Sequence, residues 1–114
     1  MSAITTHVLD ISTGSPARGV RVALEIQTSE VGWKVIGDGE TDADGRLKTL
    51  MPDGAALSAA TYRLTFDTGA YFSARGVEGF YPQVSIVFIV RDASQHHHVP
   101  LLLSPFGYST YRGS

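Results

Sequence analysis

Three consecutive histidines, His96, His97 and His98, are the residues of this chain best suited to acid–base or metal chemistry. They begin an apolar stretch typical of a β-strand, so His96 and His98 should point to one face and His97 to the other. Two imidazoles on one face can share a proton or bind a metal ion. A solvated histidine cluster at a strand end is the simpler interpretation. Zinc would need at least one more ligand, for which His7 is the candidate.

A second polar cluster, Asp42-Ala-Asp44-Gly45, superficially resembles part of a calcium-binding loop. When Gly45 is aligned with the glycine such a loop requires, Met51 stands where a bidentate glutamate belongs, so the match fails. Aspartate and glycine at this spacing instead predict a tight turn. That turn presents Arg46 at the edge of a strand, where an arginine is usually solvated.

The segment 95–114 ends in hydroxyl groups, one arginine and the chain terminus, directly after the most apolar run of the sequence. Terminal residues usually fray, because little offsets the entropy lost when they are ordered. So many hydrogen-bonding groups predict an ordered end that contributes to a site. The sequence has no Gly-x-Ser-x-Gly elbow, no evident Ser-His-Asp triad and no phosphate-binding glycine motif.

Length and composition favour one soluble globular domain with a substantial core: the chain has 114 residues, of which 43% are hydrophobic and 18% charged. The formal charge of −2 argues against nucleic acid or an anionic membrane as the main partner. The first residues lack the basic start and apolar centre of a signal peptide, and no apolar run is long enough for a membrane helix. With no cysteine and no targeting signal, we expect a cytoplasmic protein.

The elements that must position these groups are short strands, predicted where apolar and polar residues alternate. They are expected at residues 4–11, 20–28, 33–36, 46–48, 59–66, 82–90, 98–103 and 107–112. The third of them should be closed by the turn sequence Gly37-Asp38-Gly39. In the strand at 82–90, Val87 and Ile89 make the second face partly apolar, as in a central strand or one under a subunit contact.

Residues 69–76, framed by glycines, are the one plausible helix, of about two turns. About seven or eight short strands with frequent turn signals predict an all-β fold, a two-sheet antiparallel β-sandwich. Antiparallel pairing is expected because no helical crossovers are present to support parallel pairing.

Several motifs then point to a known family. They are residues 6–10 (Thr-His-Val-Leu-Asp), 14–17 (Gly-Ser-Pro-Ala), 41–46 (Thr-Asp-Ala-Asp-Gly-Arg), 80–82 (Phe-Tyr-Pro), and 98–114, which ends in Tyr-Arg-Gly-Ser. In this order and over the whole chain, they resemble 5-hydroxyisourate hydrolases, the transthyretin-related enzymes of urate breakdown, whose hallmark is the closing tetrapeptide. These enzymes often read His-Tyr-His where this chain has His96-His97-His98. Because His97 should face away from His98, we expect little effect on catalysis.

The resemblance implies a single transthyretin-like domain over residues 1–114. It also implies a homotetramer built as a dimer of dimers, with active sites in a channel between the dimers. Val87 and Ile89 are then candidate interface residues. The implied reaction opens a cyclic amide of 5-hydroxyisourate with water and yields 2-oxo-4-hydroxy-4-carboxy-5-ureidoimidazoline. No cofactor or metal, nucleic acid or membrane partner is implied.

Matched motif by motif, the family's functional residues fall on His7, Arg46, His98 and the terminal tetrapeptide. We expect His7, Arg46, His98 and Ser114 to be catalytic, with His7, Arg46, Tyr111 and Arg112 binding substrate. The two histidines would bind and deprotonate water, although the sequence leaves open which one is the base. Arg46 would stabilise negative charge on a carbonyl oxygen. The terminal carboxylate could orient a histidine or pair with Arg112.

Two other classes of function remain open at this point. One is a transthyretin-like carrier that holds a small ligand in the same channel, against which the polar tail argues. The other is a zinc-dependent cyclic amidase that uses His7, His96 and His98. Turnover of 5-hydroxyisourate separates the first from an enzyme, and activity after chelation separates the second from a metal-free mechanism.

Overall fold

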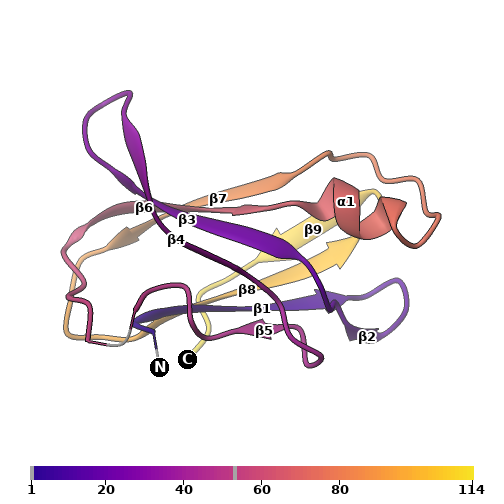
Figure 1. Ribbon diagram of the computed structural model, residues 1–114, viewed down its shortest axis with the longest axis horizontal. Helices are drawn as coiled ribbons and strands as arrows, with labels where there is room; N and C mark the ends of the chain where they lie inside the picture. Colours follow the sequence, from indigo (N-terminus) through magenta and orange to yellow (C-terminus); the bar gives the residue numbers. More distant parts are fainter. Residues whose placement is uncertain (1, 53) are drawn as a thin grey trace.

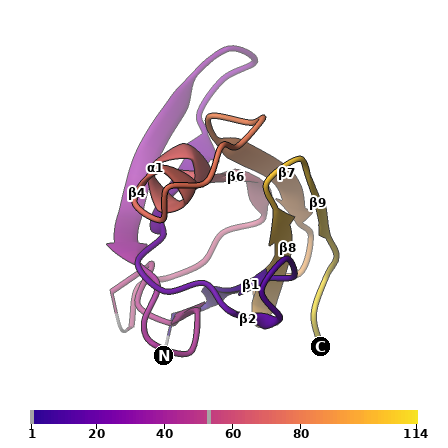
Figure 2. The same ribbon diagram turned by 90° about the vertical axis from the view of Figure 1, so that its right-hand side faces the viewer.

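The computed structural model describes residues 2–52 and 54–114. Two β-sheets face each other with a short helix beside them, which confirms the predicted β-sandwich (Figures 1 and 2). The strands are β1 (Ile4–Asp10), β2 (Ser15–Pro16), β3 (Arg21–Gln27), β4 (Trp33–Glu40), β5 (Arg46–Leu47), β6 (Ala60–Phe66), β7 (Val84–Val90), β8 (His97–Ser104) and β9 (Gly107–Thr110), and the helix is α1 (Thr68–Ser73).

The first sheet has the order β2-β1-β8-β9, and the two-residue strand β5 also pairs with β1. β8 occupies one edge of β1 along its whole length, so β2 and β5 share the other edge, where β2 pairs with the end of β1 and β5 with its middle. The second sheet has the order β4-β3-β6-β7, with every pair antiparallel. β7 and β9 are therefore the edge strands of the two sheets on the same side of the sandwich (Figure 2).

One strand pair differs from the expectation of antiparallel pairing throughout. β1 and β8 run parallel, with His7 opposite Pro100 and Thr5 opposite His98. Parallel neighbours need a long connection, which is usually a helix. Here the connection between β1 and β8 contains the entire second sheet, so no helical crossover is needed.

The turn predicted at Gly37-Asp38-Gly39 is wrong, because β4 continues through these residues to Glu40. The glycines are there because other parts of the chain approach closely: a Cβ on Gly37 would lie 1.6 Å from the Leu50 carbonyl oxygen, and one on Gly39 would lie 2.8 Å from Leu47 Cδ1. A glycine inside a strand often marks such an approach. Next to Gly37 the register with β3 shifts, leaving Ile36 without a partner as a β-bulge.

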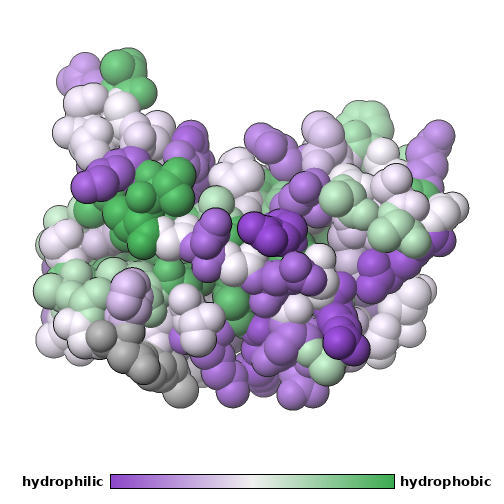
Figure 3. Space-filling model, viewed as in Figure 1, coloured by the Kyte–Doolittle hydropathy of each residue, from purple (hydrophilic) through white to green (hydrophobic). Residues whose placement is uncertain are grey.

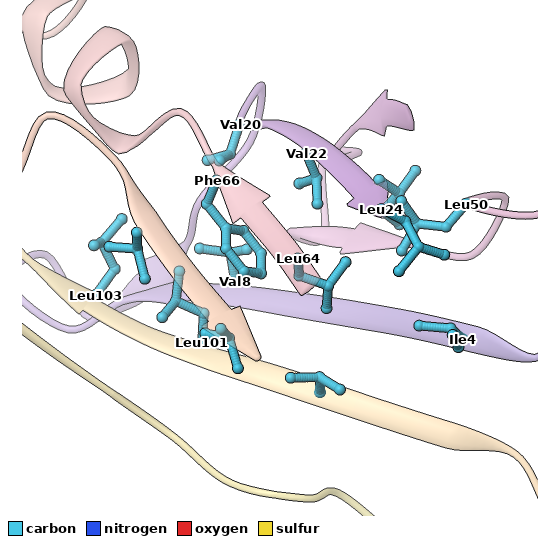
Figure 4. Packing of buried hydrophobic residues seen from close by; sticks show 14 of the residues in the cluster. Ile4, Val8, Val20, Val22, Leu24, Leu50, Leu64, Phe66, Leu101 and Leu103 are labelled. Atoms are coloured by element: carbon cyan, nitrogen blue, oxygen red, sulfur yellow. The ribbon is translucent and has the colours of Figure 1, made fainter. Parts of the chain in front are cut away.

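The core lies between the sheets and is filled from both (Figure 4). β1 and β8 contribute Ile4, Val8, Leu101 and Leu103, whereas β3 and β6 contribute Val22, Leu24, Leu64 and Phe66, all at most 2% exposed. Burying side chains of this kind stabilises the fold by about 1.5–3 kcal/mol each. Because strand side chains alternate, this core fixes which residues of β1 and β8 face outward.

Helix α1 is shorter than expected and starts at Thr68, where the Asp67 carboxylate caps it by accepting from the Ala70 amide. Polar side chains cover much of the face seen in Figure 3, while an apolar area lies near the projecting β3–β4 hairpin. Among the described residues, no helix is long and apolar enough to cross a membrane.

Candidate active site

The outer face of the first sheet carries an open cleft of about 430 Å³. Ile4 and Val8 of β1 point into the core, so the alternate residues Thr5, His7 and Leu9 face outward and line the cleft. β5 and the segment after it add a second wall, β8 adds a third, and the end of the chain completes the lining.

Strand β5 places Arg46 directly opposite His7, so that the two predicted site residues are cross-strand partners. The preceding turn is the one expected from the sequence. Asp42 Oδ1 accepts from the amides of Asp44 and Arg46, both at 2.9 Å, and Gly45 has a φ of +74°. This turn positions the start of β5 and lowers the pKa of Asp42, mainly through the hydrogen bond from the Arg46 amide.

The same turn also holds His7. Its Nε2 lies 2.9 Å from the carbonyl oxygen of Asp44, and a carbonyl can only accept, so Nε2 carries the hydrogen and donates it. In the neutral imidazole, Nδ1 is then the unprotonated nitrogen. His7 therefore has one nitrogen committed to the protein and the other available as an acceptor.

The parallel pairing of β1 and β8 brings Thr5 opposite His98. Thr5 Oγ1 lies 2.8 Å from His98 Nδ1 and 3.1 Å from His96 Nε2. The two rings are nearly parallel, with centroids 6.4 Å apart. His97 points to the opposite side, is 5% exposed, and donates from Nδ1 to the Gln95 carbonyl. The predicted separation of His96 and His98 from His97 is thus confirmed.

The surroundings of His98 lower the pKa of its imidazole below the ordinary value of 6.5. Partial burial is the largest cause, followed by the charges of Arg46, His7 and His96. Each of these disfavours a second positive charge at this position. His98 is therefore a neutral imidazole near pH 7, the form that can accept a proton.

The end of the chain packs against His98. The amide of Gly113 donates to the His98 carbonyl oxygen at 2.8 Å, and the two residues form a β-bridge. A Cβ on Gly113 would lie only 2.6 Å from His98 Cδ2, so a glycine is needed for the tail to lie this close. Tyr111 and Ser114 line the cleft beside it.

The remaining predicted residue, Arg112, is turned away from this cleft. Its Nη2 donates to the Gln95 side-chain oxygen at 2.8 Å, and its side chain lines neighbouring hollows instead. The structure thus brings His7, Arg46, His98, Tyr111 and Ser114 to one cleft. Arg112 does not line this cleft. In the described part of the chain, no three histidine or acidic side chains gather at metal-binding spacing.

Thr5 and Lys48 also belong to the cleft, although sequence reasoning did not select them. Strand parity could have found both, because Thr5 is two residues before His7 and Lys48 is two residues after Arg46. Lys48 adds a second positive charge to the lining, besides Arg46. No aspartate or glutamate side chain lines the described cleft.

Comparison with known proteins identifies the family. A family model described as HIUase/Transthyretin matches residues 4–113. The chain belongs to this family. A probable 5-hydroxyisourate hydrolase of Caenorhabditis elegans is 52% identical over 113 residues, which cover 99% of this chain and 82% of the relative.

Two solved structures with different names share this backbone closely. The 5-hydroxyisourate hydrolase of Klebsiella pneumoniae aligns with a TM-score of 0.84 and 40% identity, covering 97% of this chain and 98% of that chain. Sea bream transthyretin in complex with thyroxine aligns with a TM-score of 0.90 and 33% identity, covering 98% of this chain and 95% of that chain. The backbone therefore does not separate a hydrolase from a transthyretin that binds thyroxine, and the side chains of the site must decide.

Proposed function

We propose that this protein hydrolyses 5-hydroxyisourate, in the cleft lined by His7, Arg46 and His98. The convergence of these three side chains from β1, β5 and β8 is the observation that carries the proposal. The name of the Caenorhabditis elegans relative and that of the Klebsiella pneumoniae structure support the substrate. The substrate is a small, planar, oxidised purine rich in carbonyl and N–H groups, and its hydrolysis opens one cyclic amide.

The cleft suits catalysis better than storage of a hydrophobic ligand. Three histidines, an arginine and a lysine line it, together with Tyr111 and Ser114 of the tail. A carrier site for an apolar molecule would leave such groups without partners, which is costly. A substrate with several carbonyl and N–H groups satisfies them instead.

His98 is the proposed general base. Its lowered pKa keeps it neutral at pH 7, and Nδ1 is held by Thr5, which leaves Nε2 to take a proton from the attacking water. His7 has its Nε2 committed to the Asp44 carbonyl and offers Nδ1 as an acceptor that positions the same water. His98 then returns the proton to the nitrogen that leaves when the amide bond breaks.

Arg46 supplies the charge that the reaction needs. Attack on the amide carbonyl develops negative charge on its oxygen, and a guanidinium beside that oxygen stabilises the charge. Tyr111 and Ser114 hydrogen-bond the substrate from the tail side. Arg112 holds Gln95, so we assign it to fixing the tail, and it would reach the substrate only by releasing that bond.

We also propose the homotetramer, a dimer of dimers, that the family resemblance implies. Val87 and Ile89 on the outer face of β7 are 56% and 50% exposed, and they support an interface on this sheet. Sedimentation velocity tests the assembly: it should give four times the chain mass of 12.2 kDa. A Val87→Lys variant should sediment as a smaller species. An unchanged tetramer in this variant would contradict the proposal that this face of β7 lies in the interface.

The site assignment is tested by single substitutions to alanine at His7, Arg46 and His98. Each should lower kcat/KM for freshly made 5-hydroxyisourate by about 100-fold or more, the scale of a lost acid–base or charge-stabilising group. Circular dichroism and sedimentation should match those of the unsubstituted protein, because all three side chains face outward from the core. Near-normal turnover by His98→Ala would overturn the assignment of the base.

A further inference from the structure

The hydroxyl of Thr5 lies between two imidazoles, and there are two possible arrangements in which it donates its hydrogen to one of them. It is 2.8 Å from His98 Nδ1 and 3.1 Å from His96 Nε2, and Thr5 itself is only 3% exposed. A hydroxyl has one hydrogen to donate and can accept in return. When it donates to one histidine, it must therefore accept from the other.

The two arrangements give His98 opposite chemical characters. In the first, His98 Nδ1–H donates to Thr5, and Thr5 donates to His96 Nε2, so that His98 presents a bare Nε2 to the cleft. In the second, His96 Nε2–H donates to Thr5, and Thr5 donates to His98 Nδ1, so that His98 presents Nε2–H. The first arrangement makes His98 a base and the second makes it an acid.

We infer that Thr5 and His96 form a proton relay behind His98, an inference that rests on the proposed function. When His98 Nε2 takes a proton from water, its Nδ1 proton passes to Thr5 Oγ1, and the original hydroxyl proton passes to His96 Nε2. His98 ends neutral with its proton on Nε2, and the positive charge resides on His96. The same steps in reverse follow when His98 gives its Nε2 proton to the leaving amide nitrogen.

The placement of charges explains why the relay runs in this direction. An imidazolium at His98 would be half-buried and would face the charges of Arg46 and His7, and these causes lower its pKa. His96 is exposed, so water hydrates a positive charge there. Moving the charge outward by one hydroxyl group thus relieves the burial and repulsion that would oppose proton transfer at His98.

Thr5 and His96 are positioning residues in this scheme, because they act through His98. Their roles can be separated by substitution. Thr5→Val keeps the shape of the side chain and removes the hydroxyl, while Thr5→Ser keeps the hydroxyl. His96→Gln offers an amide oxygen that can accept from Thr5 but cannot take up a proton at neutral pH.

Steady-state kinetics on 5-hydroxyisourate test the relay. We expect Thr5→Val and His96→Gln each to lower kcat by about 100-fold with little change in KM, since neither side chain is assigned to substrate binding. Thr5→Ser should stay close to the unsubstituted protein. Wild-type kcat in Thr5→Val would overturn the relay. Wild-type kcat in His96→Gln would also overturn it, since Thr5 would then only hold the His98 ring.

Nuclear magnetic resonance gives a readout that does not depend on turnover. Long-range proton–nitrogen spectra of the substrate-free protein report which nitrogen of each of the four histidines carries hydrogen. His98 and His96 should both be protonated at Nδ1. In Thr5→Val the two histidines should no longer share this tautomer. A resting His98 protonated at Nε2 would contradict the relay. The unsubstituted protein could show both expected tautomers and yet not turn over 5-hydroxyisourate. That result would overturn the proposed function but leave the hydrogen-bonded series of His98, Thr5 and His96 supported.

Discussion

Replacing Gly113 by alanine should disable the site through a clash that can be measured in the structure. The added Cβ would lie 2.6 Å from His98 Cδ2 and 3.3 Å from both His98 Cγ and Pro100 Cγ. Reaching an ordinary contact distance of 3.4 Å requires a relative movement of about 0.8 Å. The His98 ring cannot rotate away freely, because Thr5 holds its Nδ1.

The rate effect follows from this displacement. Misplacing a catalytic group by about 1 Å can cost about 100-fold in rate, which corresponds to about 2.7 kcal/mol of transition-state stabilisation. If the tail moves instead of the ring, the bond from the Gly113 amide to the His98 carbonyl is lost, and Ser114 moves with it. Both routes lower kcat, and neither touches the core, so the melting temperature should change by only a few degrees.

The assay is the decay of 5-hydroxyisourate absorbance, with the substrate made in place from urate by urate oxidase. Gly107→Ala is the matched control, because Gly107 lies in the hairpin that leads into the tail and its added Cβ would meet only Ser104 Oγ, at an ordinary 3.7 Å. Gly107→Ala should turn over normally while Gly113→Ala is about 100-fold slower. Equal rates for both variants would refute the proposed dependence of His98 on the position of the tail.

Three further outcomes are expected. Only neutral His98 can accept a proton, and the pKa of His98 is lowered. As the pH decreases, kcat/KM should therefore fall with a midpoint below ~6.5. A midpoint above that value would contradict the assignment of His98 as the base. Lys48→Gln should raise KM at low salt, and this increase should shrink as ionic strength rises. Lys34→Gln makes the same charge change on β4 and should leave KM unchanged. Equal increases of KM in the two variants would mean that Lys48 acts only through the net charge of the protein. Treatment with a chelator should leave turnover intact, and loss of activity that added zinc restores would favour the metal-dependent alternative.

Alternation along single strands was enough to predict much of the fold. The pattern of Val20, Val22 and Leu24 predicted β3 and its buried face, and the same parity separated His97 from its two neighbours. These features depend on residues close in sequence, for which the period of two is a direct physical signal.

Features that depend on distant segments were not predictable in the same way. Gly37 sits inside β4 because the Leu50 carbonyl crosses it, and a local pattern shows only a glycine, which also suits a turn. The parallel pairing of β1 and β8 requires knowing that a whole sheet lies between them. That pairing sets Thr5 against His98, so parity along β1 could place Thr5 on the face of His7 but could not show its contact with His98.

The family motifs supplied what periodicity could not, namely that His7, Arg46 and His98 share one cleft. The structure adds the reason: β1 pairs with β5 on one edge and with β8 on the other, so residues far apart in sequence become neighbours. Arg112 shows the limit of motif transfer, since its place in the terminal tetrapeptide predicted substrate binding, while its guanidinium contacts Gln95.

The most direct test of the central claim is the number of substrate molecules converted by each protein molecule. Freshly made 5-hydroxyisourate is mixed with the protein at a concentration far below that of the substrate, and its decay is compared with the spontaneous decay. A hydrolase accelerates the decay until the substrate is exhausted, with many turnovers per chain, and His98→Ala abolishes the acceleration. Loss of only one substrate molecule per site, or decay at the spontaneous rate, would contradict catalysis and favour a carrier.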